Sequence, residues 1–202
     1  MKKKILTMAM AVVLLAGCGT IGNQGGILSG IDGTSILGNV LGSVLGLNKI
    51  SQENLVGTWK YSGPGCAFTS DNLLAQAGGE VASQKIKSTL LNYYNSAGIS
   101  SSNTYFTFGK DNTFTAKVAG KTVSGNYAYD PNTGQMTIKT LLFTINAYIT
   151  ASSSGISLLF ESQKLLTILQ TIGGMSGNAT LATIGELSRN YDGVRLGFDL
   201  AR

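Results

Sequence analysis

Residues 53–201 alternate apolar with small or polar side chains over many short stretches, and this two-residue period predicts antiparallel β-strands. The alternation is clearest at 105–108, 113–118, 122–129 and 135–139, and turn residues rich in Gly, Asn and Asp separate these stretches. Further strands are predicted at 53–61, 143–150, 156–160 and 193–201. Eight or nine strands with one apolar face close into a barrel and so hide their edges. We therefore predict a mainly β (α+β) fold built on an antiparallel barrel.

Two segments follow the helical period of 3.6 residues instead. The first, 72–95, has Ser70 or Asp71 as its capping residue, should kink at Gly78-Gly79, and places an apolar stripe at Leu74, Ala77, Val81, Ala82, Ile86, Leu90 and Tyr94. The second is a helix pair before the last strand, in which 163–172 stops at Gly173-Gly174 and a further helix follows Asn178. We expect these apolar faces to cover the ends and one side of the barrel.

The N-terminus carries the pattern of a signal peptide over residues 1–17. Lys2, Lys3 and Lys4 precede an apolar run, 5–15, that is too short to span a bilayer. Its ending, Leu15-Ala16-Gly17-Cys18, resembles the lipobox of bacterial lipoproteins. That resemblance implies cleavage before Cys18, a diacylglyceryl group and acyl chains such as palmitate on this cysteine, and attachment to a membrane of the cell envelope. We expect this membrane to be the outer membrane, and the protein could be displayed on either of its two faces.

Residues 18–50 form a Gly-rich tether between Cys18 and the folded domain, which we assign to 51–202. Glycines recur every fourth residue at Gly38, Gly42 and Gly46, with aliphatic residues between them. A flexible linker is one interpretation, because each glycine in a helix costs about 1 kcal/mol relative to alanine. The other is a helix over 36–47 that contacts the membrane or self-associates through its Gly-xxx-Gly spacing.

Removal of residues 1–17 changes the charge and the cysteine count. Three of the fifteen basic residues lie there, which leaves twelve basic against ten acidic residues. Nucleic-acid binding needs a strongly basic face, so no nucleic-acid partner is expected. With Cys18 acylated, Cys66 is the one remaining cysteine, and no basic residue lies nearer in sequence than Lys60. We expect its thiol to be buried and unreactive.

The absence of histidine excludes Ser-His-Asp and Cys-His catalysis and a His-ligated zinc site. Residues 119–122 match the end of a P-loop, but they sit in a hairpin turn. Asp130, Asn132 and Gly134 imitate the start of a calcium loop that lacks its twelfth, acidic position, which is Leu141. We therefore expect no enzymatic activity, no cofactor and no metal.

Gly57-Thr58-Trp59 at the first strand resembles the Gly-x-Trp signature of lipocalins. The order of elements resembles a lipocalin-like lipoprotein family of Gram-negative bacteria, as do the segments 57–61, 70–75 (SDNLLA) and 190–193 (NYDG). The resemblance spans most of 50–202 and implies a lipocalin-like barrel, but this family carries no assigned function. In lipocalins the tryptophan lies at the closed end under a basic side chain of the last strand. The counterpart here would be Arg195, or else Arg202, against Trp59.

Two hypotheses about function follow. The barrel could be a binding module for a small apolar or amphipathic ligand, with the helix at 72–95 as its lid. Alternatively, the same residues fill a solid core, and the domain is a scaffold or interaction protein of the envelope with a protein partner. The residues that line the cavity or fill the core are Trp59, Phe106, Phe108, Phe114, Tyr127, Tyr129 and Met136.

Overall fold

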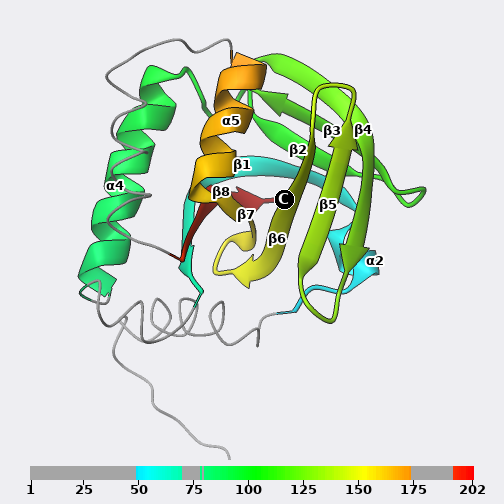
Figure 1. Cartoon of the computed structure of the whole chain (residues 1–202), viewed down its shortest axis with the longest axis horizontal. Coiled ribbons are helices and arrows are strands. Elements are labelled where there is room, and N and C mark those ends of the chain that lie inside the picture. Colours follow the sequence, from blue (N-terminus) through cyan, green and yellow to red (C-terminus); the bar gives the residue numbers. More distant parts are fainter. Residues whose placement is uncertain (1–48, 70–77, 79, 174–192) are drawn as a thin grey trace, which may run out of the picture. The chain divides into compact units, whose positions relative to one another are not determined.

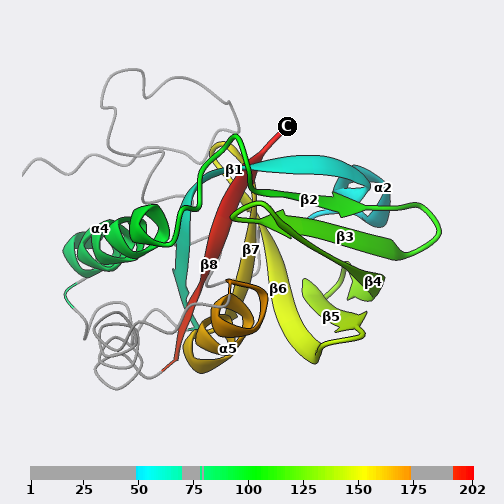
Figure 2. The same cartoon turned by 90° about the horizontal axis from the view of Figure 1, so that it is seen from above.

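The computed structural model describes residues 49–69, 78, 80–173 and 193–202, and all of them belong to one compact unit of the chain. Eight antiparallel strands form a closed barrel in which each strand pairs with its neighbours in sequence and β1 pairs with β8 (Figures 1 and 2). The strands are β1 (Gly57–Phe68), β2 (Tyr105–Phe108), β3 (Thr113–Val118), β4 (Lys121–Asp130), β5 (Gln135–Thr140), β6 (Thr144–Ser152), β7 (Gly155–Glu161) and β8 (Val194–Ala201). The predicted barrel is confirmed.

The start of the barrel differs from the prediction. Residues Gln52–Leu55 form a short helix, α2, capped by the Ser51 side chain, so the strand begins at Gly57 and not at Glu53. β1 then continues to Phe68, seven residues past the predicted end. The strand includes Gly63 and Pro64 because β8 pairs with this second half of β1. Strand β2 pairs only with the first four residues of β1. A proline is tolerated where a strand has a single neighbour.

Strands β3 to β5 follow the alternation closely. Their inward side chains, such as Phe114, Ala116, Ile138 and Met136, are buried in one apolar core, and the residues between them face outward. A strand whose side chains alternate in this way has one face on the core and one in solvent.

Helix α4 (Glu80–Ser96) lies along the second half of β1 (Figure 2). It confirms the later part of the predicted helix at 72–95, whereas residues 70–77, with the proposed cap, lie outside the described residues. The helix buries Ala82, Ile86, Leu90 and both Tyr93 and Tyr94 in the core. The prediction that Val81 belongs to this apolar stripe is wrong, because Val81 is 78% exposed.

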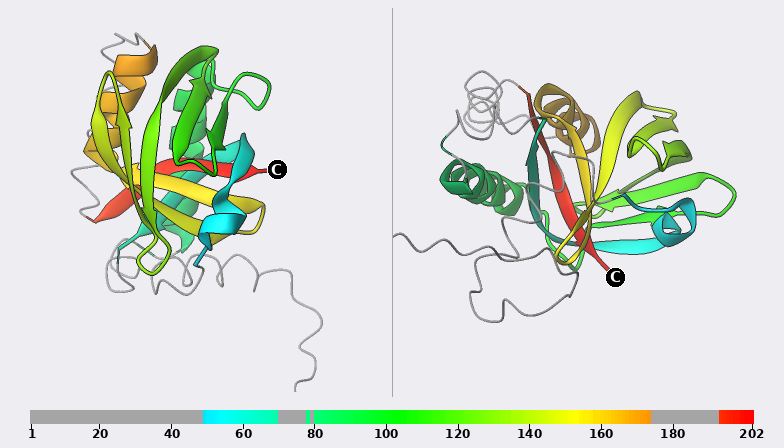
Figure 3. Two further views of the ribbon diagram at one scale, coloured as in Figure 1. Left: turned by 90° about the vertical axis from the view of Figure 1, so that its right-hand side faces the viewer. Right: turned by 90° about the horizontal axis from the view of Figure 1, so that it is seen from below.

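Helix α5 (Ser162–Gly173) confirms the predicted helix at 163–172, and its continuation after Gly173 lies outside the described residues. It buries Leu165, Ile168 and Leu169 and contacts β7, β8 and β4. β4 and β8 lie four places apart in a ring of eight strands, so they are opposite walls of the barrel. A helix that contacts both walls lies across one end of the barrel, which we call the α5 end. Helix α2 lies on the opposite side (Figure 3).

Candidate functional site in the barrel interior

The end of the barrel near α2 is closed by Trp59. Its indole N–H donates a hydrogen bond to the Leu55 carbonyl oxygen at 2.8 Å, and Leu55 is fully buried beneath it. The Arg202 guanidinium lies 4.5 Å from the centre of the Trp59 ring and donates to the carbonyl oxygens of Asn54 and Val56 at 2.6 and 3.1 Å. These contacts fix α2 against the barrel, and we call this the closed end.

The arginine over Trp59 is Arg202, so the pairing of Trp59 with Arg195 is wrong. Arg195 precedes Arg202 by seven residues, which corresponds to about 23 Å along an extended strand. Its guanidinium lies 3.3 Å from the centre of the Tyr148 ring, on the face of the sheet that it shares with Glu161. Arg195 therefore belongs to the outer surface near the α5 end.

Three aromatic side chains form what we call the closed-end cluster: Phe108, Phe114 and Tyr127. The ring of Phe108 lies 5.6 Å from Phe114 and 5.3 Å from Tyr127, centre to centre. The Tyr127 hydroxyl donates to the Gly109 carbonyl oxygen at 2.9 Å and accepts from the Gln52 side chain at 3.5 Å. Every ring in this cluster is thus packed, and its one hydroxyl is bonded within the protein.

Tyr129 and Met136, a directly opposed pair on β4 and β5, complete this half of the interior. The Tyr129 hydroxyl donates to the Ile50 carbonyl oxygen at 2.7 Å, so it holds the chain that leads into α2. Met136 is almost completely buried in the same core. Tyr129 and Met136 are therefore both held by contacts within the protein.

A second group of aromatic residues lies where α4 meets the barrel, and we call it the Tyr61 cluster: Tyr61, Tyr94, Phe106 and Phe198. Tyr94 of α4 stacks on Phe198 with ring centres 5.1 Å apart, and Phe106 contacts Phe198 at the same distance. Tyr61 makes edge contacts with Tyr94 at 5.8 Å and Phe198 at 6.1 Å. Of these four residues, Phe106 alone was a candidate from the sequence.

The two tyrosine hydroxyls of the Tyr61 cluster differ in their hydrogen bonding. That of Tyr94 donates to the Gly197 carbonyl oxygen at 2.8 Å. That of Tyr61 is buried and has no hydrogen-bond partner among the described residues. Leaving such a group unsatisfied costs about 1–3 kcal/mol. Burial, with a smaller contribution from the Asp199 charge, raises the pKa of Tyr61 from 10.0 to about 12, so the hydroxyl keeps its proton as a donor.

A polar group lies on the other face of the same sheet. Asp199 accepts hydrogen bonds from Lys87 of α4 at 2.9 Å and from the Ser157 hydroxyl. Gly63 of β1 stands directly opposite Asp199 and presents no side chain. This ion pair links α4 to β8, and sequence alone could not show it because 112 residues separate its partners.

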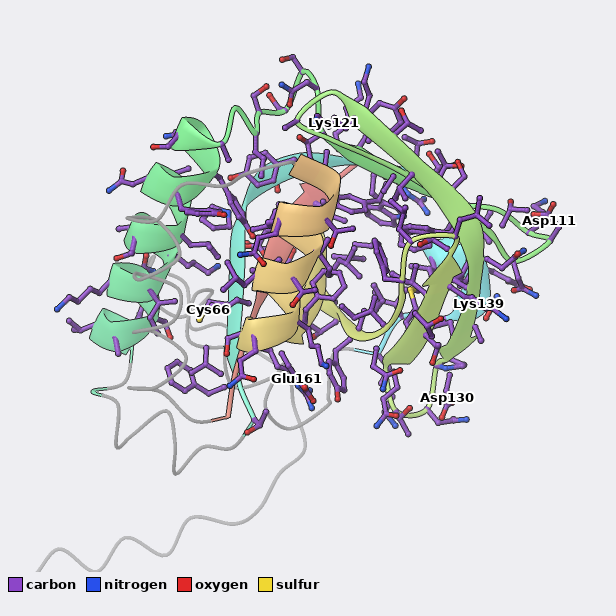
Figure 4. All side chains as sticks on the ribbon, turned by 45° about the horizontal axis from the view of Figure 1, so that its top comes forward. Cys66, Asp111, Lys121, Asp130, Lys139 and Glu161 are labelled. Atoms are coloured by element: carbon purple, nitrogen blue, oxygen red, sulfur yellow. The ribbon has the colours of Figure 1, made fainter. Side chains whose placement is uncertain are left out.

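Cys66 is a free, partly buried cysteine on β1, on the side where α4 lies (Figure 4). Burial raises the pKa of its thiol from 9.0 to about 12, and the Asp199 charge adds to this while Lys87 opposes it. The thiol therefore stays protonated at neutral pH. The expected burial is only partly found, because Cys66 is intermediate in exposure, and the low reactivity of its thiol stays a prediction.

Among the described residues, no group of three or more His, Cys, Asp or Glu side chains is arranged to hold a metal ion. In the same part of the chain, no helix combines the length and hydropathy needed to cross a membrane.

Comparison with protein families gives a match to the family described as Lipocalin-like domain (DUF4923), over residues 32–202. This span contains the whole described barrel together with α2, α4 and α5. No curated protein matches the chain, and no solved structure matches it.

Proposed function

Because this chain belongs to the lipocalin-like domain family, whose barrel suggests a ligand-binding module, we propose that it binds a small apolar or amphipathic molecule inside the barrel, beside the Tyr61 cluster. Binding sites of this kind are lined mainly by apolar and aromatic side chains with a few polar groups that orient the ligand. Phe106, Phe198 and Tyr94 would supply the apolar wall.

The observation that carries this proposal is the buried hydroxyl of Tyr61, which has no hydrogen-bond partner within the part of the chain that the structure describes. Buried hydroxyls in folded proteins nearly always have a partner, so an unpaired one calls for an explanation. A ligand with a carbonyl, carboxylate or hydroxyl oxygen would accept its hydrogen bond and remove the cost of burial. The raised pKa of Tyr61 fits a donor that stays protonated.

The closed-end cluster has a different role in this proposal. The hydroxyls of Tyr127 and Tyr129 are already bonded to backbone oxygens, and Trp59 is bonded to α2. These residues, with Phe108, Phe114 and Met136, form the floor on which a ligand would rest. Helix α5 covers the opposite end of the barrel, so the lid role predicted for the helix at 72–95 suits α5 better.

The remaining parts of the proposal rest on the sequence. Cys18 would carry a diacylglyceryl group and hold the protein at a membrane of the cell envelope, with the outer membrane as the expected one. The protein would bind its ligand without transforming it, since the chain has no histidine and the described residues contain no clustered metal ligands.

A scaffold with a solid core is the second candidate. The packed rings and bonded hydroxyls of the closed-end cluster favour it for that half of the barrel. In this case the interior binds nothing, and a protein partner of the envelope contacts the outer surface.

Native and denaturing mass spectrometry of the protein purified from its own cells distinguishes the two. We expect a reproducible small mass that is retained in the native spectrum and lost on denaturation. A native mass equal to that of the polypeptide and its covalent groups alone, in repeated preparations, would contradict ligand binding. A co-purifying protein in place of a small molecule would support the scaffold.

A further inference from the structure

The α5 end of the barrel carries an exposed apolar turn between β5 and β6, which we call the rim turn (residues 141–143). The Thr140 hydroxyl oxygen accepts the backbone N–H groups of Leu142 and Phe143, both at 3.1 Å, and the Phe143 carbonyl accepts the Thr140 N–H at 2.9 Å. Phe143 packs partly on the core. These bonds fix the backbone of the turn.

The two leucines of the rim turn project into solvent. Leu141 is fully exposed, and Leu142 is 61% exposed. Single exposed apolar residues are ordinary on protein surfaces. Two adjacent leucines on a turn with a fixed backbone are different, because the chain could place polar residues there at no structural cost. Such a feature indicates a contact surface.

The charges around the rim turn are mainly positive. Strand direction alternates, so the β3–β4 turn, the rim turn and the start of α5 share one end of the barrel. The charged residues near this end are Lys117, Lys121, Lys139, Lys164 and Arg195 against Glu161, which stands directly opposite Arg195. In Figure 4, Lys121 lies beside the upper end of α5, and Lys139 lies farther along the barrel wall, toward the side on which Asp111 and Asp130 are labelled. Within the described ranges the one salt bridge is Lys87–Asp199, so these lysines have no acidic partner there.

The closed end has a different balance, because it carries as many acidic as basic residues: Glu53, Asp111 and Asp130 against Lys49, Lys110 and Arg202. The large exposed apolar residues of the described chain are the two leucines of the rim turn and two residues of α4, Val81 and Leu91. The α5 end therefore combines an apolar tip with an excess of positive charge.

We propose that the α5 end docks on an anionic phospholipid bilayer, with Leu141 and Leu142 inserted at the boundary of headgroups and acyl chains and Lys121 and Lys139 against lipid phosphates. Lysines near an anionic surface and apolar side chains at that depth both strengthen peripheral binding. A stable protein interface buries about 1,000 Å² or more, which two leucines on a turn do not supply. The proposal goes beyond ligand binding, because docking needs no ligand in the barrel.

A dye at the rim turn tests the docked orientation. Full-length protein carrying Cys18→Ser and Cys66→Ala would receive one cysteine, by Leu142→Cys or, as control, by Val81→Cys on α4, and each would be labelled with an environment-sensitive dye. With vesicles of phosphatidylcholine and phosphatidylglycerol, we expect a shift to shorter emission wavelength at residue 142 and none at 81. Because the dye reports position, binding through residues 1–48 does not imitate this result. An unchanged spectrum at 142, or equal shifts at both positions, would overturn the proposal.

Affinity provides a second measurement on the Cys18→Ser chain. Leu141→Ser with Leu142→Ser should weaken vesicle binding by about tenfold or more, since both apolar side chains leave the bilayer. Val81→Ser with Leu91→Ser should leave it unchanged. Lys121→Glu with Lys139→Glu should weaken binding to anionic vesicles and not to pure phosphatidylcholine. Loss of affinity in the α4 control equal to that in the rim turn would contradict the assigned surface, as would no binding of the parent chain.

Discussion

The closed-end cluster and the Tyr61 cluster contain the same kinds of side chain, but they differ in what their hydroxyls do. In the closed-end cluster, Tyr127 donates to a backbone carbonyl and the interior is tied to α2. In the Tyr61 cluster, Tyr94 is bonded in the same way, whereas Tyr61 has no partner among the described residues. An aromatic lining alone therefore does not identify a binding site. Among the described residues, two buried hydroxyls have no partner, those of Tyr61 and of Ser83 on α4, and the Tyr61 hydroxyl is the one that belongs to an aromatic cluster of the barrel.

The largest expected effect is in the closed-end cluster. Phe108→Ala should lower the free energy of unfolding by about 3–5 kcal/mol, because a fully buried ring in contact with two others is lost. Urea unfolding measures this change, and Lys110→Ala on the adjacent exposed turn is the control, with an expected change within about 0.5 kcal/mol. If the closed-end cluster is only a floor, the folded fraction of Phe108→Ala still retains the ligand. Loss of ligand without loss of stability would reverse the roles of the two clusters.

Removal of single hydroxyls comes next. Tyr94→Phe leaves the buried Gly197 carbonyl without its side-chain donor and should cost about 1–3 kcal/mol. Tyr61→Phe should be neutral or stabilising in the ligand-free protein, because it removes a buried hydroxyl that no described residue bonds. Denaturant midpoints of the two variants measure the difference. Equal destabilisation by both would show that Tyr61 has a structural partner.

The Arg202 contacts should have a smaller effect, since this side chain is exposed. Arg202→Ala loses two hydrogen bonds to α2 and the contact over Trp59, and should cost about 1 kcal/mol. Arg202→Lys keeps the charge but not the planar group that reaches both carbonyls, so most of the loss should remain. Thermal unfolding compares the two. Full stability in the lysine variant would mean that charge alone matters at the closed end.

The last prediction concerns alkaline pH, where the change accumulates over about three pH units. The folded-state pKa of Cys66 is about 12, against 9.0 for an ordinary thiol. The protonated thiol therefore contributes fully to the free energy of unfolding below pH 9, and this contribution is lost as the pH rises toward 12. The wild-type protein should lose stability with a slope of up to about 1 kcal/mol per pH unit from this group. In Cys66→Ala, the decline should begin near pH 10, where Tyr61 starts to contribute. Superimposable profiles of free energy against pH would contradict the burial of this thiol.

The strands β2 to β6 and helix α5 could be predicted from the sequence because each buries mainly one face, so apolar side chains recur at the period of the element. Strand β7 is buried on both faces over residues 156–160, and it was predictable as a short apolar run after a turn. The second half of β1 could not be predicted. At Gly65, an added Cβ would lie 2.9 Å from the Leu159 side chain and 3.1 Å from Asp199, so the glycine is required by neighbours that are remote in sequence. From the neighbouring sequence alone, a glycine at this position indicates a turn.

The candidate site was predictable only in part for the same reason. The inward aromatics of β2 to β5 follow from alternation, but the Tyr61 cluster brings together β1, β2, α4 and β8. Whether the Tyr61 hydroxyl is paired depends on side chains more than 30 residues away. The choice between Arg195 and Arg202 likewise depends on the register of β8 against β1.

The most direct test of the central claim is ligand retention in two matched variants, Tyr61→Phe and Tyr127→Phe, purified from the native cells and compared with wild type by native mass spectrometry. Each substitution removes one hydroxyl from the interior. The account predicts that the ligand-bound fraction falls strongly in Tyr61→Phe and is unchanged in Tyr127→Phe. Equal retention in both variants, or loss confined to Tyr127→Phe, would contradict it.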